Sequence, residues 1–229
     1  MYKYFDRHLQ DRYNLCDNTH CQAFNGLSQD SVINRAALET QGLVILAQDS
    51  TLIISAFHSN CGGETVTSKD VWLSNVPYQK KVIDPYCISS RNSKWEKRVS
   101  MNEWLGLIKK LGYDGNTDDP SAFIFYQKSR QNDYKTGSFR VSLLTIRADL
   151  NLRSTFFSVL TDGDSIILKG RGYGHGVGLC QEGAMVMAGK GFNYLQIIDF
   201  YYSGVFISDI KNAVILPVAL ISKFPSGGL

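Results

Sequence analysis

The chain has 229 residues, of which 44% are hydrophobic and 12% aromatic, so it can bury a sizeable core and form one large domain or two small ones. A net charge of +3, without a dense run of lysine and arginine, gives little support to nucleic-acid binding. No stretch approaches the roughly 18 apolar residues of a membrane span. The start of the chain also lacks the apolar run of a signal peptide. These features predict a folded domain with no transmembrane segment in this chain.

The N-terminal part is expected to form two helices. Residues 2–15 have a helical pattern with no capping residue before them, which indicates that an N-terminal portion is missing. A second helix is predicted over residues 30–40, where Asp30 or Ser31 can cap the start and Gly42 marks the end. Its apolar face is expected to be formed by a short set of residues: Ile33, Ala36, Ala37.

A β-hairpin is predicted to follow the second helix. Residues 43–46 and 52–57 are short runs rich in β-forming residues, and they flank the polar turn at residues 48–51. The second run ends in residues 58–63 (HSNCGG). A strand end followed by a permissive loop is a common place for a functional site.

Residues 100–112 have the signature of a core helix. Ser100 with Glu103 three places later forms a capping box. The apolar residues of this segment fall on one helical face: Trp104, Leu107, Ile108, Leu111. That face is expected to pack into the hydrophobic core rather than to bind a cofactor.

The remaining elements define the fold class. Several strand-like runs follow residue 122, and a short helix or turn is expected at residues 145–154. The runs are residues 123–126, 139–144, 155–158 and 165–168. Residues 192–202 read as a helix that stops at Gly204. The prediction is an α+β fold with mainly antiparallel strands and helices packed at the ends.

The most distinctive segment is residues 171–184 (RGYGHGVGLCQEGA), in which five glycines surround His175, Gln181 and Glu182. Dense glycine indicates either a tight turn between a strand and a helix or a place where a ligand approaches the backbone. The three polar side chains favour the ligand site, because a purely structural turn does not need them.

The cysteines indicate a local site. Cys16 and Cys21 enclose His20 within six residues, and two thiolates with an imidazole suit zinc. A disulfide between Cys16 and Cys21 explains the same spacing equally well. His58 and Cys61 are further candidate ligands, although a structural role is the stronger hypothesis for His58.

Acid–base catalysis needs a carboxyl group with a raised pKa or a histidine near its ordinary pKa. The candidates are Glu64, His175 and Glu182, whereas Glu39 lies in the middle of a predicted helix and is expected to face solvent. The chain has no nucleophile-elbow motif of serine hydrolases, no dinucleotide fingerprint and no P-loop.

Several motifs in order along the chain resemble the SpoIID/LytB family, which comprises stage II sporulation protein D transglycosylases and amidase-enhancer proteins. The match covers roughly residues 2–208, within a predicted SpoIID/LytB-like domain at 1–215 that is N-terminally incomplete and precedes a C-terminal tail at 216–229. The motifs are 16–22 (CDNTHCQ), 58–63 (HSNCGG), 71–72 (VW), 77–78 (PY), 152–156 (LRSTF), 170–178 (GRGYGHGVG), Gln181, 183–184 (GA) and 201–204 (YYSG).

The resemblance implies an extracytoplasmic lytic transglycosylase that cleaves peptidoglycan glycan strands stripped of stem peptides and leaves 1,6-anhydro-N-acetylmuramic acid ends. One carboxylic acid suffices for this reaction, because the 6-hydroxyl of the sugar attacks the anomeric carbon. The family's catalytic glutamate has no match here, so Glu64 and His175 are the remaining candidates. A non-catalytic module that binds peptidoglycan and enhances a cell-wall amidase is the alternative.

The resemblance also implies roles for residues of the matched motifs. The zinc ligands would be Cys16, His20 and Cys21. The residues that line the glycan groove would be Tyr173, His175, Gln181 and His58. In this interpretation, the glycines around Tyr173 let the sugar approach the backbone while the tyrosine ring stacks on a sugar face.

Overall fold

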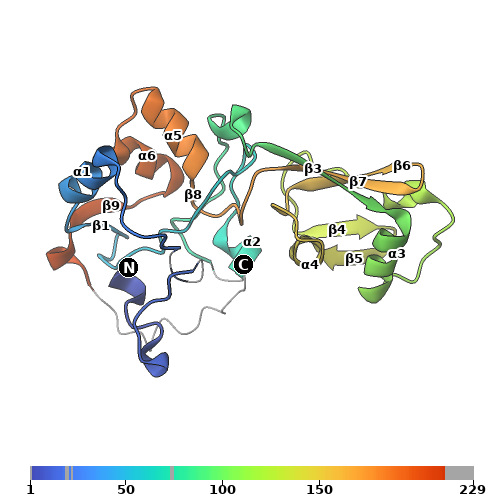
Figure 1. Cartoon of the computed structure of the whole chain (residues 1–229), viewed down its shortest axis with the longest axis horizontal. Coiled ribbons are helices and arrows are strands. Elements are labelled where there is room, and N and C mark those ends of the chain that lie inside the picture. The colour runs from blue at the N-terminus through green and yellow to red at the C-terminus, as the bar shows by residue number, and fades with distance from the viewer. Residues whose placement is uncertain (1, 19–20, 22, 73–74, 215–229) are drawn as a thin grey trace. The chain divides into compact units, whose positions relative to one another are not determined.

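The computed structural model describes residues 2–18, 21, 23–72 and 75–214, so the C-terminal tail predicted at 216–229 lies outside the described residues (Figure 1). The chain divides into two compact units, the smaller formed by Met1–Ser55 and Tyr202–Leu229 and the larger by Ala56–Tyr201. The family-like domain predicted at residues 1–215 includes segments of both units.

The N-terminal segment of the smaller unit differs from the predicted helix over residues 2–15. It holds two single-turn 3-10 helices, η1 (Tyr2–Tyr4) and η2 (Leu9–Asp11). The second ends at Arg12, whose backbone is left-handed with a φ of 69°. A non-glycine residue in this region cannot continue a right-handed helix. The amide of Tyr13 instead returns to the carbonyl of His8 at 3.3 Å.

The second predicted helix is confirmed as α1 (Ser31–Glu39). Asp30 is its N-cap, and its carboxylate accepts a hydrogen bond from the amide of Val32 at 2.8 Å. No residue of α1 is buried, so the predicted apolar face is exposed, with Ile33 56% accessible. The cap and the helical hydrogen bonds therefore define this helix, not core packing.

The predicted hairpin forms in part, and β1 also pairs with a distant segment. The turn at residues 48–51 forms, and the returning chain pairs briefly with β1 through the antiparallel bridge between Leu46 and Leu52 and a hydrogen bond from the amide of Ile53 to the carbonyl of Ile45 at 3.2 Å. Strand β1 (Leu43–Leu46) pairs over its whole length with β9 (Phe206–Asp209), antiparallel, and β9 is followed by η5 (Ile210–Asn212). The strand partner of β1 comes from the far end of the chain, where short-range turn signals carry no information.

The larger unit is built on a three-stranded antiparallel sheet in the order β3-β7-β6. Its strands are β3 (Lys94–Ser100), β6 (Phe157–Asp162) and β7 (Ser165–Arg171). A second antiparallel pair joins β4 (Asp133–Thr136) to β5 (Phe139–Ser142). Helix α3 (Met101–Lys110) and the β4–β5 pair lie on one side of the sheet, below it in Figure 1.

The core of the larger unit lies between these elements. The predicted helix at residues 100–112 is confirmed, and the hydroxyl of Ser100 accepts from the amide of Glu103 at 3.1 Å. Trp104 is fully buried and meets the ring of Tyr134 edge-on at 5.4 Å between centroids. Leu107 and Ile108 are buried beside it.

Two predicted strands next to this core are wrong or too long. Residues 123–126 follow the 3-10 helix η4 (Pro120–Phe123), and only Phe125 bridges to Val159. The strand predicted over 139–144 ends at Ser142, whose hydroxyl accepts from the amide of Leu144 and caps α4 (Leu143–Asp149). A serine at an N-cap position is thus a stronger signal than the β-rich residues around it.

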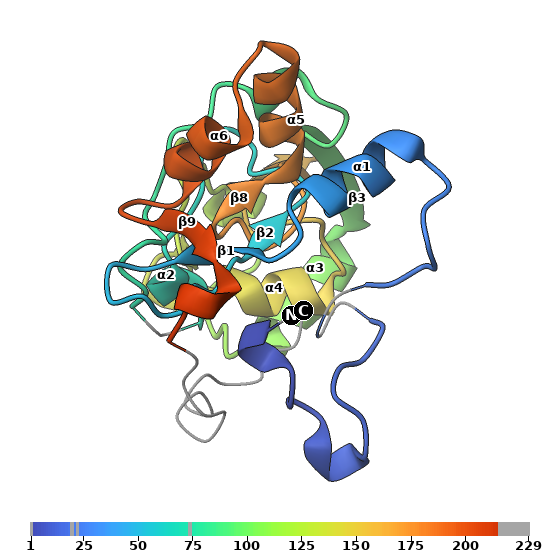
Figure 2. The same cartoon turned by 90° about the vertical axis from the view of Figure 1, so that its left-hand side faces the viewer.

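The rest of the larger unit surrounds a short parallel pair, β2 (Phe57–His58) with β8 (Leu179–Cys180). Helices α5 (Gln181–Gly189) and α6 (Tyr194–Tyr201) lie side by side next to β8 (Figure 2). A short helix, α2 (Ser68–Trp72), and the 3-10 helix η3 (Cys87–Ser89) complete the unit. The molecule is an α+β protein with mostly antiparallel pairing, as predicted.

Within the described ranges, no helix combines the length and apolar character needed to cross a membrane.

The core packing gives a first prediction. We expect Trp104→Ala to lower the free energy of unfolding by about 3–5 kcal/mol, because it opens a large cavity in a fully buried site. Urea unfolding followed by circular dichroism measures the change. Tyr126→Ala is the matched control, because Tyr126 is 64% exposed and its loss is expected to change stability by less than about 0.5 kcal/mol. Equal losses in both variants would contradict this description of the core.

Candidate functional site

Two loops that are far apart in the sequence interlock in the larger unit. One follows β2 and carries residues 58–63, and the other joins β7 to β8 and carries residues 172–178. Asn60 and Tyr173 exchange two backbone hydrogen bonds, at 3.1 and 2.8 Å. The amide of Val66 also donates to the carbonyl of Gly176 at 2.9 Å. This pairing places the two strongest motifs of the sequence side by side.

The glycines of these loops serve the contact between the loops. Gly172 and Gly174 have φ angles of +77° and +111°, which side chains rarely adopt. A Cβ on Gly172 would lie 2.6 Å from the carbonyl oxygen of Asn60, and one on Gly174 would lie 2.8 Å from the Cβ of His58. At both positions the chain itself fills the space that a side chain would take, so the lack of a Cβ serves the contact between the loops.

Tyr173 is the residue of this loop that reaches solvent. Its side chain is 45% exposed, and the guanidinium of Arg153 lies 5.8 Å from the centre of its ring. Arg153 also lines a shallow cavity of about 290 Å³ beside β3, together with Lys94, Trp95, Glu96, Lys97, Asn151 and Leu152. An exposed aromatic ring next to a mainly basic hollow can bind an anionic sugar chain.

The two predicted site histidines lie beneath this surface. His58 is buried, and its Nδ1 donates to the carbonyl of Val177 at 3.1 Å, while its Nε2 has no hydrogen-bond partner among the described residues. Burial holds the pKa of His58 well below its usual value. Its ring meets that of His175 edge-on at 5.5 Å between centroids.

His175 is tied to the chain around it. Its Nδ1 accepts a hydrogen bond from the amide of Val177 at 3.0 Å, and an interaction with the backbone of Phe57 raises its pKa in part. Its ring also contacts that of Trp72, with 5.1 Å between centroids. Burial lowers the pKa of His175 to about 4, so the ring is neutral at pH 7. These contacts hold the loop in place.

The candidate carboxylates differ in their surroundings. Burial by itself would raise the pKa of Glu64, but hydrogen bonds from the backbone of Arg130 and from Lys81 and Ser129 outweigh it and lower the pKa. Glu64 is therefore ionised at neutral pH and is not a proton donor. Glu182 accepts hydrogen bonds from the side-chain amides of Asn60 at 2.6 Å and Asn92 at 2.5 Å.

The predicted zinc ligands of the smaller unit are partly described. Donor atoms of Cys16, Cys21 and His8 lie within 4.8 Å of one another, whereas His20 lies outside the described residues. The described cysteines form no disulfide. Two sulfurs and an imidazole fit zinc, and Nδ1 of His8 lies 3.0 Å from a carboxylate oxygen of Asp11, an orientation common for metal-binding histidines.

His8 was missed by the sequence analysis. It lies eight residues before Cys16, inside the segment predicted as a continuous helix, so no short ligand spacing marks it. The left-handed turn at Arg12 brings the chain back toward the cysteines.

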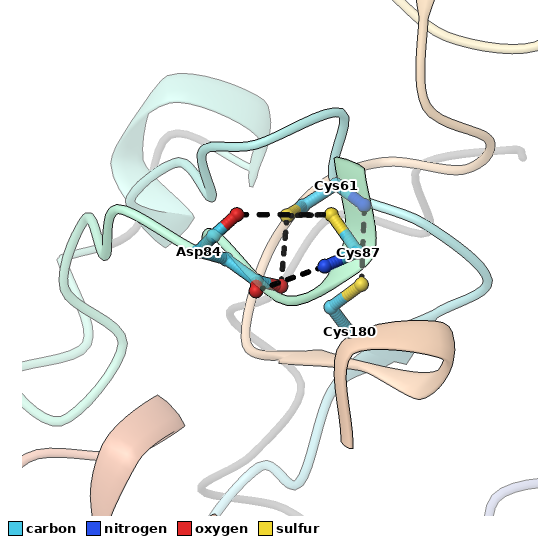
Figure 3. Close-up of side chains that lie close together, drawn as sticks. All are labelled: Cys61, Asp84, Cys87 and Cys180. Carbon is cyan, nitrogen blue, oxygen red and sulfur yellow. Dashed lines mark hydrogen bonds between the residues drawn. The ribbon is translucent and has the colours of Figure 1, made fainter. Parts of the chain in front are cut away.

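A second group of donor atoms lies in the larger unit. Cys61, Asp84, Cys87 and Cys180 are all buried, and their donor atoms lie within 4.8 Å of one another (Figure 3). These atoms are close enough to hold a metal ion. Hydrogen bonds from the thiols of Cys180 and Cys61 lower the pKa of Cys87 to about 2, whereas burial raises the pKa of Asp84. The sequence analysis named Cys61 as a candidate ligand, but for the site at Cys16 and Cys21, and it missed Asp84, Cys87 and Cys180 because the members of this group come from three separate segments.

The half-buried His175 gives a pH prediction. The pKa of His175 is about 4 in the folded chain and about 6.5 in the unfolded chain, so the unfolded state binds more protons between these values. We expect the free energy of unfolding to decrease as the pH falls from about 6.5 to about 4, and to decrease less steeply in His175→Gln. Urea unfolding at a series of pH values measures this. Ring-proton NMR that shows His175 titrating near pH 6.5 in the folded protein would contradict it.

No protein-family model matches the chain. The chain is 28% identical to the amidase enhancer of Bacillus subtilis (strain 168), over 82% of this chain and 34% of the relative. It is 31% identical to stage II sporulation protein D of the same strain, over 77% of this chain and 51% of the relative. The protein of that name from Bacillus amyloliquefaciens is 32% identical, over 79% and 52%.

The chain spans about a third to a half of the lengths of these three relatives. Both kinds of relative carry the names that the motif resemblance predicts, and the aligned part covers most of this chain. The chain belongs to a SpoIID/LytB-like family.

Proposed function

We propose that this chain binds and orients peptidoglycan glycan strands for lytic transglycosylation in the cell wall, outside the cytoplasm. The strands are those stripped of stem peptides, and the products carry 1,6-anhydro-N-acetylmuramic acid ends. The names of the relatives support a cell-wall role. The single observation that carries the proposal is the exposed ring of Tyr173 on a loop held by the facing loop.

The charges around Tyr173 support the preference for stripped strands. Removal of a stem peptide leaves a carboxylate on each muramic acid, so a stripped strand is a polyanion. Lys94 and Arg153 line the cavity beside Tyr173, and neither forms an ion pair within the described ranges. They are therefore available to attract these carboxylates, while the tyrosine ring covers a sugar face.

The other predicted site residues divide by exposure. Gln181 is exposed at the start of α5, so we assign it with Tyr173 to direct contact with the glycan. His58 is buried and His175 is a half-buried residue of the loop itself, and we assign both to positioning the loop. Neither Glu64, which is ionised, nor His175, whose ring is neutral at pH 7, is assigned as the donor of the proton that the leaving oxygen needs.

A second function has its own support. The amidase enhancer of Bacillus subtilis is 28% identical over 82% of this chain. A module that binds glycan and presents it to a cell-wall amidase needs the same exposed tyrosine and basic hollow, but it needs no catalytic acid. The two functions differ in one readout, the release of cleaved glycan.

Glycan binding is tested first. We expect Tyr173→Ala to weaken binding to purified stripped glycan strands by about 2- to 12-fold, which corresponds to an aromatic contact of roughly 0.5–1.5 kcal/mol. Cosedimentation or titration calorimetry measures the affinity. Tyr126→Ala, which removes another exposed tyrosine, is expected to bind like the unchanged chain. If Tyr173→Ala binds equally well, the glycan surface lies elsewhere.

Activity is tested separately on the same strands. If a group other than Glu64 and His175 supplies the proton, the chain should release fragments with 1,6-anhydro-N-acetylmuramic acid ends, identified by mass spectrometry, and release fewer from strands that retain stem peptides. Intact stripped strands recovered with bound protein would reject transglycosylation by this chain and favour the amidase-enhancing module. In that case, addition of a cell-wall amidase should give faster peptide release with the chain than without it.

A further inference from the structure

The second donor cluster takes no part in the proposed glycan contact, and it is a fully buried polar group of the larger unit. Cys61, Asp84, Cys87 and Cys180 are each fully inaccessible to solvent. Asp84 forms no ion pair within the described residues. A carboxylate in such a place is costly unless a positive charge accompanies it, and the same holds for the thiols once they are ionised.

We propose that Cys61, Asp84, Cys87 and Cys180 bind a structural zinc ion, separate from the cysteine and histidine ligands of the smaller unit. Three sulfurs and one carboxylate oxygen fill the four positions that zinc takes in closed sites, so no position is left for substrate or water. This makes the ion structural rather than catalytic. The proposal is independent of the proposed function.

The distances fit a tetrahedral ion. Zn–S bonds of about 2.3 Å and Zn–O bonds of about 2.0–2.2 Å give separations of roughly 3.5–3.8 Å between ligand atoms. The sulfur of Cys61 lies 3.3 Å from that of Cys87 and 3.2 Å from a carboxylate oxygen of Asp84, and all four donors lie within 4.8 Å. A disulfide would need about 2.05 Å between sulfurs. Small side-chain rotations are enough to admit the ion.

The groups around the cluster orient its donors. The hydroxyl of Tyr201 donates to Oδ2 of Asp84 at 2.9 Å, and the amide of Tyr86 donates to Oδ1 at 2.8 Å. The amides of Cys61 and Gly183 donate to the sulfur of Cys180 at 3.3 and 3.4 Å. Donors of this kind stabilise the negative charge of metal-bound thiolates and carboxylates.

Two further features keep the cluster compact and negative. A Cβ on Gly183 would collide with the hydroxyl of Tyr201 and the carboxylate of Asp84, so only glycine fits there. Cys180 is the N-cap of α5, and the positive end of that helix favours a thiolate at this position. A zinc ion here would join the loop after β2, the segment before η3 and the start of α5. The ion would therefore stabilise the two interlocked loops from their buried side.

The experiment uses the full chain with the other zinc site removed. In Cys16→Ser/Cys21→Ser, we expect about one zinc ion per chain by inductively coupled plasma mass spectrometry. Adding Cys87→Ser or Cys180→Ser to this background should reduce the zinc content to background. Circular dichroism reports whether each variant is folded.

Cobalt binding tests the site in the background variant itself, so this test does not depend on whether the variants with a further cysteine substitution fold. In the Cys16→Ser/Cys21→Ser background, Co²⁺ should give a thiolate-to-cobalt charge-transfer band with the intensity of three thiolates, and thermal stability should rise on metal addition. A folded background variant that takes up neither zinc nor cobalt would overturn the proposal. So would a Cys61–Cys87 disulfide found by non-reducing peptide mapping, or iron in place of zinc in the purified chain.

Discussion

The backbone pairing between Asn60 and Tyr173 is the constraint on which the larger unit depends. It closes the loop after β2 onto the loop before β8, and it works only because glycine occupies positions where any side chain would meet the opposite loop. The amide of Gly174 adds a third tie, to the carbonyl of Arg153 at 2.9 Å. A rigid pair of loops reduces the entropy that Tyr173 would lose on binding a ligand.

The same pairing positions the proposed glycan-binding surface on its solvent side and the proposed metal ligands on its buried side. Toward solvent it presents Tyr173 next to the basic hollow that contains Arg153. Toward the interior it brings Cys61 close to Cys180, where the proposed zinc ion would bind. Metal binding beneath a ligand surface is a means of stabilising loops that have few apolar contacts of their own.

Local signals predicted the elements that depend on local physics. The helix after Ser100 was predicted because its cap and its apolar spacing agree, and the helix after Asp30 because an acidic cap precedes good helix formers. The continuous helix over residues 2–15 was wrong, because a left-handed residue at Arg12 interrupts it. The hairpin after Gly42 forms only as a turn with a short returning segment, and the full-length strand partner of β1 is β9. Neither the left-handed backbone at Arg12 nor the pairing of β1 with β9 can be predicted from a short window of sequence.

The sequence by itself determined the family, the α+β class and the importance of the glycine-rich segment, because these depend on ordered motifs and on residue types. Only the tertiary structure decided why the glycines are there and which donors meet. The space beside Gly174 is filled by His58. Cys16 lies near His8 in one cluster, and Cys180 lies near Cys61 and Asp84 in the other. The physical reason is that ligand sites depend on distance in space. The chain reaches that distance only after segments far apart in sequence have paired.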